Sequence, residues 1–511
     1  MTGQEAVERI HQEAWIGREP GLSRITKLLS MVGDPHKALK FVHITGTNGK
    51  GSTAAMTASI LAAAGLRVGL YTSPHLWRFH ERFQVSGQPI PDEALGRIGE
   101  RVILAGRQMD DPATEFELMT ALGMLYFQEA KCDLVVLEVG LGGRLDSTNV
   151  IPAPEVAVIT NIGLEHVEQL GDTHAKIAGE KAGIIKPGCD TVLYHQRRDV
   201  EEVVTDACRH AGSPMTVTDP DSLKVLSTGR DGQDFLYRGE GPYHINLLGH
   251  YQLSNALTAL DIAAVLRRRG WPICQEAVLE GMKKAVWPAR MELARRDPDV
   301  ILDGGHNPQC MGAIRQALEE LYPGKKIYFL VGVLEDKDYH SMVGQLLPLA
   351  KAFITITPDS QRALQAQALA DYLRGEGAEA HSCETVQQGM DNLFAEALGA
   401  DVPVLAVAAF QAAAGEKHRP AAAGSADAGF LPVMKGGAGD LEHRPGPAKT
   451  GGTGAIRLAA ARAKCTGNRN VHGKAPIGKD TNCEKQARKR LNKEHQMSII
   501  WLKCAKTYGI L

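Results

Sequence analysis

Apolar residues occur along this chain in short runs, separated by glycine-rich turns and by longer stretches with helical spacing. The run Phe41–Thr45 is apolar and β-branched, which predicts a buried strand. A glycine-rich segment follows at residues 46–51, and the alanine-rich stretch Ser52–Ala64 predicts a helix that ends at Gly65. A strand, a glycine-rich loop and a helix are therefore expected in direct succession.

The same alternation continues to about residue 285. Further strands are predicted at Arg67–Thr72, Cys132–Val139 and Val156–Thr160, and helices at Glu115–Ala130, Thr173–Ala182 and Gln252–Arg268. Residues 190–248 have a more β-rich and less regular pattern. Long alternation of this kind predicts a parallel sheet covered by helices on both faces.

A second α/β unit is predicted to begin near Arg290, after a linker at residues 286–289. Its expected strands are Val300–Asp303, Lys326–Val331, Ala352–Thr357 and Val402–Val407, and its helices lie near Pro308–Leu321, Gln361–Leu373 and Thr385–Leu398. This is the pattern of a smaller doubly wound domain. We therefore expect one domain over residues 1–287, a second over residues 288–416, and an active site in the cleft between them.

The last part of the chain differs in composition. Residues 417–511 carry 18 Lys/Arg and 6 Asp/Glu, which gives this segment a net charge of +12. Because the net charge of the whole chain is −2, the remaining residues carry a net charge of −14. Residues 420–454 are rich in Ala, Gly and Pro, and residues 464–493 are basic without any period. We expect a low-complexity extension that is disordered or the product of a frameshift. Contact between this basic tail and nucleic acid or an anionic surface stays open.

Composition sets further limits. Among the 511 residues 44% are hydrophobic, and the net charge of −2 predicts neither a nucleic-acid partner nor a membrane partner. The first 17 residues contain three Glu and no apolar core, which argues against a signal peptide, and no apolar run approaches the ~20 residues of a spanning helix. Nine cysteines without a CxxC pair favour a reducing cytoplasm and argue against structural zinc.

The loop after the first strand carries the clearest chemistry. Its residues are Gly46, Thr47, Asn48, Gly49, Lys50, Gly51 and Ser52. Glycines let backbone N–H groups approach phosphate oxygens, the helix end favours negative charge, and Lys50 adds a cation. The spacing departs from the common P-loop, which has Gly where this chain has Ile44 and Ser or Thr where it has Gly51.

Two side chains follow neighbouring strands and could bind a cation. Glu138 ends a buried strand near the phosphate loop, a position suited to Mg²⁺, and His166 follows the end of the next strand. Taken alone, Glu138 could equally be a surface acid and His166 a structural histidine.

The string Gly-Thr-Asn-Gly-Lys-Gly-Ser resembles the ATP loop of the Mur ligase superfamily. Within it, the chain is most similar to the folylpolyglutamate synthase/dihydrofolate synthase family. The motifs that carry the resemblance occur in family order over about residues 20–410: Ser-Pro-His-Leu at 73–76, Glu-Val-Gly-Leu-Gly-Gly-Arg-Leu-Asp-Ser-Thr-Asn at 138–149, Asn-Ile-Gly-Leu-Glu-His at 161–166, Pro-Ala-Arg-Met-Glu at 288–292 and Asp-Gly-Gly-His-Asn-Pro at 303–308. The resemblance implies a P-loop-containing three-layer αβα domain followed by a smaller Rossmann-like α/β domain.

The resemblance also implies roles for particular residues. The expected ligands of two Mg²⁺ ions are Ser52, Ser73, Glu138 and His166. Asp146 and the loop residues Ser73, Pro74 and His75 are expected at the pterin. Lys181 matches a lysine that becomes carbamoylated, which is chemically coherent because burial lowers the pKa of a lysine and the neutral amine can take up CO₂.

ATP is expected to contact residues of both halves of the chain. Asn255 matches the residue that contacts adenine, Arg290 would bind the phosphates, Asp303 the ribose, and His306 would face the transferred phosphate. Lys50, Lys181, Arg290 and His306 form the expected catalytic set. The chain departs from the family pattern at Glu165, where the family has Asp, at Tyr251 and Ala289, and at 408–410, where a Gly-Ser pair is expected.

These observations predict an ATP-dependent amide ligase that adds L-glutamate to dihydropteroate, to the γ-carboxylate of folyl(poly)glutamates, or to both, through an acyl phosphate. The expected partners are those small molecules, and the expected state is a cytoplasmic monomer. Two alternatives stay open. The altered C-terminus could leave a catalytically disabled nucleotide-binding homologue, or the chain could be another Mur-type amino-acid ligase, although no room for a UDP-sugar-binding domain is apparent before Gly46.

Overall fold

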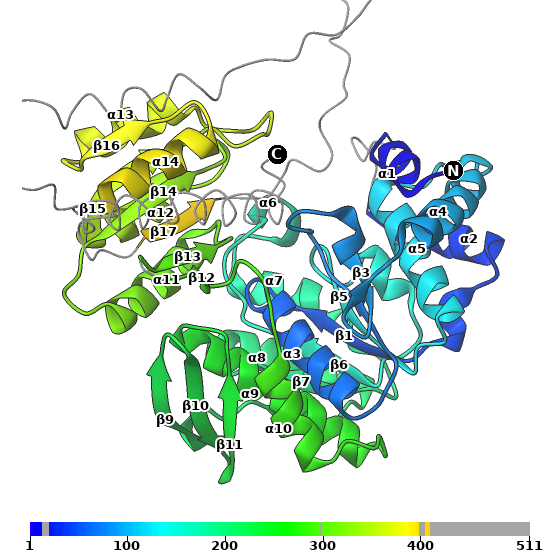
Figure 1. Ribbon diagram of the computed structural model, residues 1–511. Coiled ribbons are helices and arrows are strands. Elements are labelled where there is room, and N and C mark those ends of the chain that lie inside the picture. Colours follow the sequence, from blue (N-terminus) through cyan, green and yellow to red (C-terminus); the bar gives the residue numbers. More distant parts are fainter. Residues whose placement is uncertain (13–19, 297, 398–403, 409–511) are drawn as a thin grey trace, which may run out of the picture. The chain divides into compact units, whose positions relative to one another are not determined.

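The computed structural model describes residues 1–12, 20–296, 298–397 and 404–408. The predicted tail and the altered end at residues 409–410 lie outside these residues. An eight-stranded sheet occupies the first part of the chain (Figure 1). Its strands, in spatial order, are β4 (Gln88–Pro89), β3 (Phe83–Val85), β2 (Val68–Tyr71), β5 (Leu134–Glu138), β1 (Phe41–Thr45), β6 (Val156–Ile159), β7 (Asp190–Leu193) and β8 (Met215–Val217).

The strands from β2 to β8 are parallel, as the alternation of elements predicts, and β3 and β4 add an antiparallel edge. Because successive side chains of a strand point to opposite faces, each strand contributes to two cores. Val135 and Leu137 of β5 pack on one face, and Leu134 and Val136 pack on the other.

Helices cover both faces of this sheet, which makes the predicted three-layer arrangement. One face packs against α1 (Gly3–His11), α2 (Ser23–Met31), α4 (Asp92–Arg107) and α5 (Glu115–Glu129) (Figure 1). The other packs against α3 (Lys50–Ala63), α9 (His250–Arg268) and α10 (Gln275–Lys284). The short helix α6 (Val167–Leu170) leads into α7 (His174–Ala182).

Residues 190–248 correct one expectation. They contain a three-stranded antiparallel sheet, formed by β9 (Leu223–Gly229), β10 (Gly232–Tyr237) and β11 (Glu240–Ile245), but also the 14-residue helix α8 (Arg198–Ala211). Only Val200, Val204 and Cys208 of α8 are buried, at a spacing of four residues. A spacing of four residues is the helical period, so the pattern was present in the sequence; the valines of this segment, which also favour strands, led to the β-rich interpretation.

A six-stranded sheet follows, with the strand order β12 (Glu292–Arg295), β13 (Val300–Asp303), β17 (Val404–Ala408), β14 (Ile327–Gly332), β15 (Ala350–Thr355) and β16 (Ala380–Ser382). Its helices are α11 (Pro308–Leu321), α12 (Tyr339–Leu346), α13 (Ala366–Gly375) and α14 (Val386–Ala397). All strands except β12 are parallel to their neighbours, which confirms the doubly wound prediction.

The described part of the chain belongs to one compact unit, and the proposed boundary between residues 287 and 288 stays a prediction. In the described ranges, five 3₁₀ turns connect elements: Pro35–Ala38, Phe79–Arg82, Ser147–Val150, Pro220–Ser222 and Leu347–Leu349. Among the described residues, no helix combines the length and the apolar character that crossing a membrane requires.

Candidate functional site

The glycine-rich loop lies between the end of β1 and the start of α3, at the carboxyl edge of the parallel sheet. The backbone N–H of Thr47 donates to Asn161 O over 2.7 Å, and the hydroxyl of Thr160 donates to the carbonyls of Thr45 and Asn48. These bonds hold the loop against the end of β6. The free N–H groups of the first turn of α3 then face the position where a phosphate binds at a helix N-terminus.

Gly49 is a position where the loop requires glycine. It caps α3 in the left-handed region, with φ of 87°. A Cβ at this position would lie 2.3 Å from the side-chain oxygen of Asn255, which is itself held by Gln252. Asn255, the expected adenine contact, therefore lies directly beside the phosphate loop.

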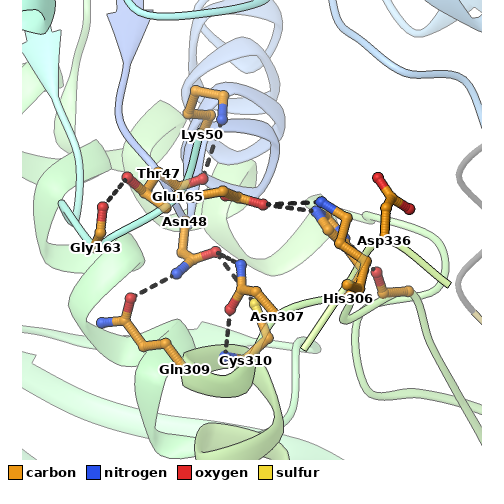
Figure 2. Close-up of polar contacts among 12 residues, drawn as sticks. Thr47, Asn48, Lys50, Gly163, Glu165, His306, Asn307, Gln309, Cys310 and Asp336 are labelled. Atoms are coloured by element: carbon orange, nitrogen blue, oxygen red, sulfur yellow. Dashed lines mark hydrogen bonds and ion pairs between the residues drawn. The ribbon is translucent and has the colours of Figure 1, made fainter. Parts of the chain in front are cut away.

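Two lysines converge on the carbonyl oxygen of Gly46. Lys50 Nζ donates to the carbonyls of Gly46 and Thr47, each over 3.1 Å (Figure 2), and Lys181 Nζ donates to Gly46 over 2.8 Å. Burial lowers the pKa of Lys181 to about 7, and the charge of Lys50 acts in the same direction. Near neutral pH a substantial fraction of Lys181 is therefore a neutral amine at the edge of the loop.

Glu138 lies at the end of β5, paired in register with Ile44 of β1, so its carboxylate is next to the loop. It is buried and accepts a 3.1 Å hydrogen bond from the backbone N–H of Ser73. Burial raises the pKa of Glu138, whereas the charges of Lys50 and Arg290 lower it. The structure thus brings two of the expected metal residues, Ser73 and Glu138, into contact.

The other two expected metal residues are Ser52, which is buried in the first turn of α3, and His166, which caps α6 in the left-handed region. Among the described residues, no group of three or more His, Cys, Asp or Glu side chains is arranged to hold a metal. A Mg²⁺ ion that uses one protein carboxylate together with phosphate oxygens and water still fits Glu138. The two-ion site stays a prediction.

A cavity of about 520 Å³ opens beside this carboxylate. Ser73, Pro74 and Asp146 line it, as expected for a substrate pocket, together with the apolar side chains of Phe116, Leu141, Leu145 and Leu170. A Cβ on Gly140 would lie 2.4 Å from the ring of Phe116, so this glycine leaves room for the ring to form the wall. Charged side chains line it as well, among them Arg24, Arg82 and Glu117, so the cavity suits a molecule with both apolar and polar parts.

Asp146 and His75 are more occupied than the sequence suggests. The carboxylate of Asp146 accepts hydrogen bonds from the backbone N–H groups of Leu141 and Thr148 and from the Thr148 hydroxyl, so it fixes its own loop. Burial raises the pKa of Asp146. His75 is buried outside the cavity lining, and burial lowers its pKa to about 3. Both roles at a pterin stay predictions.

The second sheet contributes three expected residues. Asp303, at the end of β13, accepts hydrogen bonds from the backbone N–H groups of Met291 and Gly305, and burial raises its pKa. Arg290 Nη1 donates to the carbonyl of Ala289 over 2.9 Å. His306 Nδ1 donates to Gly304 O, and its Nε2 lies 3.5 Å from Glu165 Oε1 (Figure 2).

Glu165, to which the sequence analysis assigned no role, lies beside two basic side chains. Its carboxylate also lies 3.7 Å from Lys337 Nζ, and its side chain is only 13% exposed. Burial alone would raise the pKa of Glu165, but the neighbouring His306 and the charge of Lys337 lower it to about 2. In the sequence, the indication that this position matters was that Glu165 stands where the family has Asp.

The side chain of Asn48 connects the loop to the start of α11. Its amide donates to Gln309 Oε1 over 2.8 Å, and its oxygen accepts from Asn307 Nδ2 over 3.1 Å (Figure 2). Asn307 in turn caps α11 through Cys310 N. Nothing in the sequence pattern predicts these contacts, because they depend on the placement of α11.

Known proteins share both halves of this arrangement. Residues 44–263 match the Mur ligase middle domain, and residues 289–410 match the Mur ligase glutamate ligase domain. The chain is 37% identical over 376 residues to folylpolyglutamate synthase of Lacticaseibacillus casei, which covers 71% of this chain and 87% of that one. It is 36% identical over 379 residues to dihydrofolate synthase/folylpolyglutamate synthase of Bacillus subtilis, with coverages of 72% and 88%.

Solved structures agree with this similarity. A crystal structure of folylpolyglutamate synthase from Thermotoga maritima superposes with a TM-score of 0.71 at 32% identity, covering 80% of this chain and 94% of that one. An FPGS–AMPPCP–folate complex superposes with a TM-score of 0.70 at 33% identity, covering 80% and 97%.

Proposed function

The chain belongs to the folylpolyglutamate synthase/dihydrofolate synthase family of Mur ligases, and from this membership we propose that it is an ATP-dependent ligase that joins L-glutamate to dihydropteroate, to folyl(poly)glutamates, or to both. ATP and these small molecules are its substrates. The relatives include one protein named for folylpolyglutamate synthesis alone and one named for both activities, so the relative rates on the two acceptors are for experiment to decide.

One observation carries the proposal: Ser73 connects the cavity to Glu138, which lies at the end of the strand next to the one that leads into the phosphate loop. Ser73 lines the cavity and donates its backbone N–H to Glu138, and Glu138 is paired with the strand that leads into the loop. An acid bound in the cavity with its carboxylate toward Ser73 would therefore point toward Glu138 and the neighbouring strand that leads into the phosphate loop. Positioning of this kind is a large part of catalysis between two bound substrates.

The reaction proceeds in two balanced steps. A carboxylate oxygen of the acceptor attacks the γ-phosphorus of ATP, the bond to the β-phosphate oxygen breaks, and ADP and an acyl phosphate form. The amine of glutamate then attacks the acyl carbon, loses a proton, and the tetrahedral intermediate releases phosphate to give the amide. Lys50 and the N-terminal turn of α3 bind the phosphates, and Arg290 and His306 complete the charge stabilisation.

Glu138 would hold Mg²⁺, which supplies charge neutralisation at the phosphates when it is bound. Lys181 is suited to carbamoylation because burial lowers its pKa to about 7 and leaves a reactive amine. The carbamate is an anion beside the loop and would support a second metal ion. We also propose that the protein acts as a monomer and that it acts in the cytoplasm, where reducing conditions suit its scattered thiols.

Incorporation of labelled glutamate tests the proposal. The full chain is incubated with ATP, Mg²⁺ and glutamate, with dihydropteroate or a tetrahydrofolate as acceptor, and an assay without ATP is the control. ATP-dependent label in either product supports the ligase. Binding of ATP without label in either product contradicts it and favours the disabled homologue.

A further inference from the structure

The charged side chains that line the cavity are almost all neutralised by protein groups. Arg24 lies 3.1 Å from Glu117, Glu115 lies 2.8 Å from His11, and Glu180 lies 2.9 Å from Arg144. Asp146 is surrounded by backbone donors. The remaining charged residue of the lining is Arg82.

Arg82 differs from the others in both burial and partners. It is 8% exposed, at the end of the 3₁₀ turn Phe79–Arg82. Among the residues that the structure describes, it forms no ion pair within 4.0 Å, and its only side-chain hydrogen bond joins Nε to His75 Nδ1 over 2.8 Å. A guanidinium has five N–H donors, so the four on Nη1 and Nη2 stay available.

His75 fixes the orientation of this guanidinium without cancelling its charge. The imidazole is buried, and because Arg82 Nε donates to its Nδ1, that nitrogen carries no proton and the ring is neutral. Burial lowers the pKa of Arg82, but the carboxylates of Glu115 and Glu138 raise it, and the guanidinium stays charged. Among the described residues these carboxylates all lie more than 4.0 Å from the guanidinium, and its near contact is the ring of Phe79, 5.8 Å from Cζ to the ring centroid. A buried cation without a paired anion is costly unless a ligand supplies one.

We propose that Arg82 binds a carboxylate of the pteridine-bearing acid, with His75 as the residue that positions it. The inference rests on the proposed function and adds to it the group that recognises the anionic end of the acceptor. The planar fork of Arg82 matches a carboxylate, the apolar walls around Phe116 accept the flat ring, and Ser73 in the same lining leads to Glu138.

The test compares an acid with its neutral counterpart. Dissociation constants of dihydropteroate and of its carboxamide are measured for the full chain and for Arg82→Gln, Arg82→Lys and Arg78→Gln. Arg78 is an exposed arginine of the same loop and serves as the matched control. Loss of a charge-assisted pair predicts roughly 10- to 100-fold weaker acid binding in Arg82→Gln, an intermediate loss in Arg82→Lys, and no change in Arg78→Gln. Carboxamide and ATP binding should change less than about twofold.

Equal weakening of acid and carboxamide, or unchanged acid binding, overturns the inference, because a merely structural arginine does not distinguish them. If Arg82→Gln fails to fold, the acid-to-amide ratio of Arg82→Lys decides the question. Failure of the proposed function can be distinguished from failure of the Arg82 inference, because in that case the wild-type chain incorporates no glutamate. The pair 4-aminobenzoate and 4-aminobenzamide then reports the charge preference directly, and a preference that disappears in both Arg82 variants sustains the carboxylate site.

Discussion

Lys181 on α7 donates a 2.8 Å hydrogen bond from Nζ to the carbonyl oxygen of Gly46, so a buried amine is in direct contact with the phosphate loop. The Lys50 ammonium donates to the same carbonyl. Two lysines that share one acceptor repel each other, and deprotonation of Lys181 relieves that repulsion. The contact therefore links protonation of Lys181 to the stability and chemistry of the loop.

The first prediction concerns stability against pH. Burial lowers the pKa of Lys181 from its ordinary 10.5 to about 7, so between these values the unfolded chain binds more protons than the folded chain. The penalty is complete below about pH 7 and disappears toward pH 10.5, and the slope is about 1.4 kcal/mol per pH unit. Urea unfolding in CO₂-free buffer should show Lys181→Met more stable than wild type at pH 7, with the difference decreasing by pH 9. The exposed Lys176→Met is the control, and parallel profiles for wild type and Lys181→Met would contradict the assignment.

A second prediction concerns carbamoylation of the same amine. Lys181 is partly neutral near pH 7. Protein equilibrated with ¹³C-bicarbonate should therefore show one carbamate carbonyl resonance in addition to the resonance from the carbamate of the N-terminal amine. The resonance should be absent from Lys181→Met and present in Lys176→Met. An identical spectrum for all three proteins would show that Lys181 is not modified.

The loop glycine Gly49 gives a third prediction. Alanine at Gly49 must adopt φ of 87° and would bring its Cβ within 2.3 Å of Asn255. Gly65 has a similar φ of 85° with nothing within 4 Å, so Gly65→Ala measures the backbone cost alone, about 1 kcal/mol. Gly49→Ala should cost more than Gly65→Ala in thermal unfolding and should abolish ATP binding in calorimetry. Equal costs with ATP binding retained would mean that the loop relaxes freely.

Glu165 provides a fourth prediction. Its carboxylate lies 3.5 Å from His306 and 3.7 Å from Lys337, so Glu165→Gln releases His306, which is expected at the transferred phosphate, and the neighbouring Lys337. We expect kcat to fall about tenfold while the Kd of ATP stays unchanged, since the phosphate loop is intact. Glu168→Gln, an exposed change in the next helix, should have no effect. A loss confined to ATP affinity would place Glu165 in nucleotide binding instead.

The sequence was sufficient for the features set by local pattern. The ends of β1, β5 and β6 fall within one or two residues of their predicted positions, because buried parallel strands are continuous apolar runs with polar residues at their ends. Glu138 and Lys181 were found through motifs, and their positions at the loop follow from strand order. The helix α8 was missed although Val200, Val204 and Cys208 recur at helical spacing, because its β-branched valines favoured a β-rich interpretation of the segment.

Partners of individual side chains could not be read from the sequence. Asp146 accepts bonds from several backbone donors, and within the described part of the chain Arg82 has no carboxylate within 4.0 Å. Both are simply charged residues in loops when only the sequence is known. Such differences arise when segments distant in sequence pack together and either supply or withhold a partner. The sequence identified where the chemistry lies, and the structure showed which groups are free to take part.

The central claim is that the acceptor carboxylate itself attacks the γ-phosphate. Dihydropteroate labelled with ¹⁸O in its carboxylate, incubated with the full chain, ATP, Mg²⁺ and glutamate, tests this directly by mass spectrometry of the released phosphate. The account predicts one ¹⁸O atom transferred to phosphate for each amide formed, with ADP as the other product. Unlabelled phosphate, or release of AMP and pyrophosphate, would contradict an acyl phosphate and with it the proposed arrangement of the cavity beside the loop.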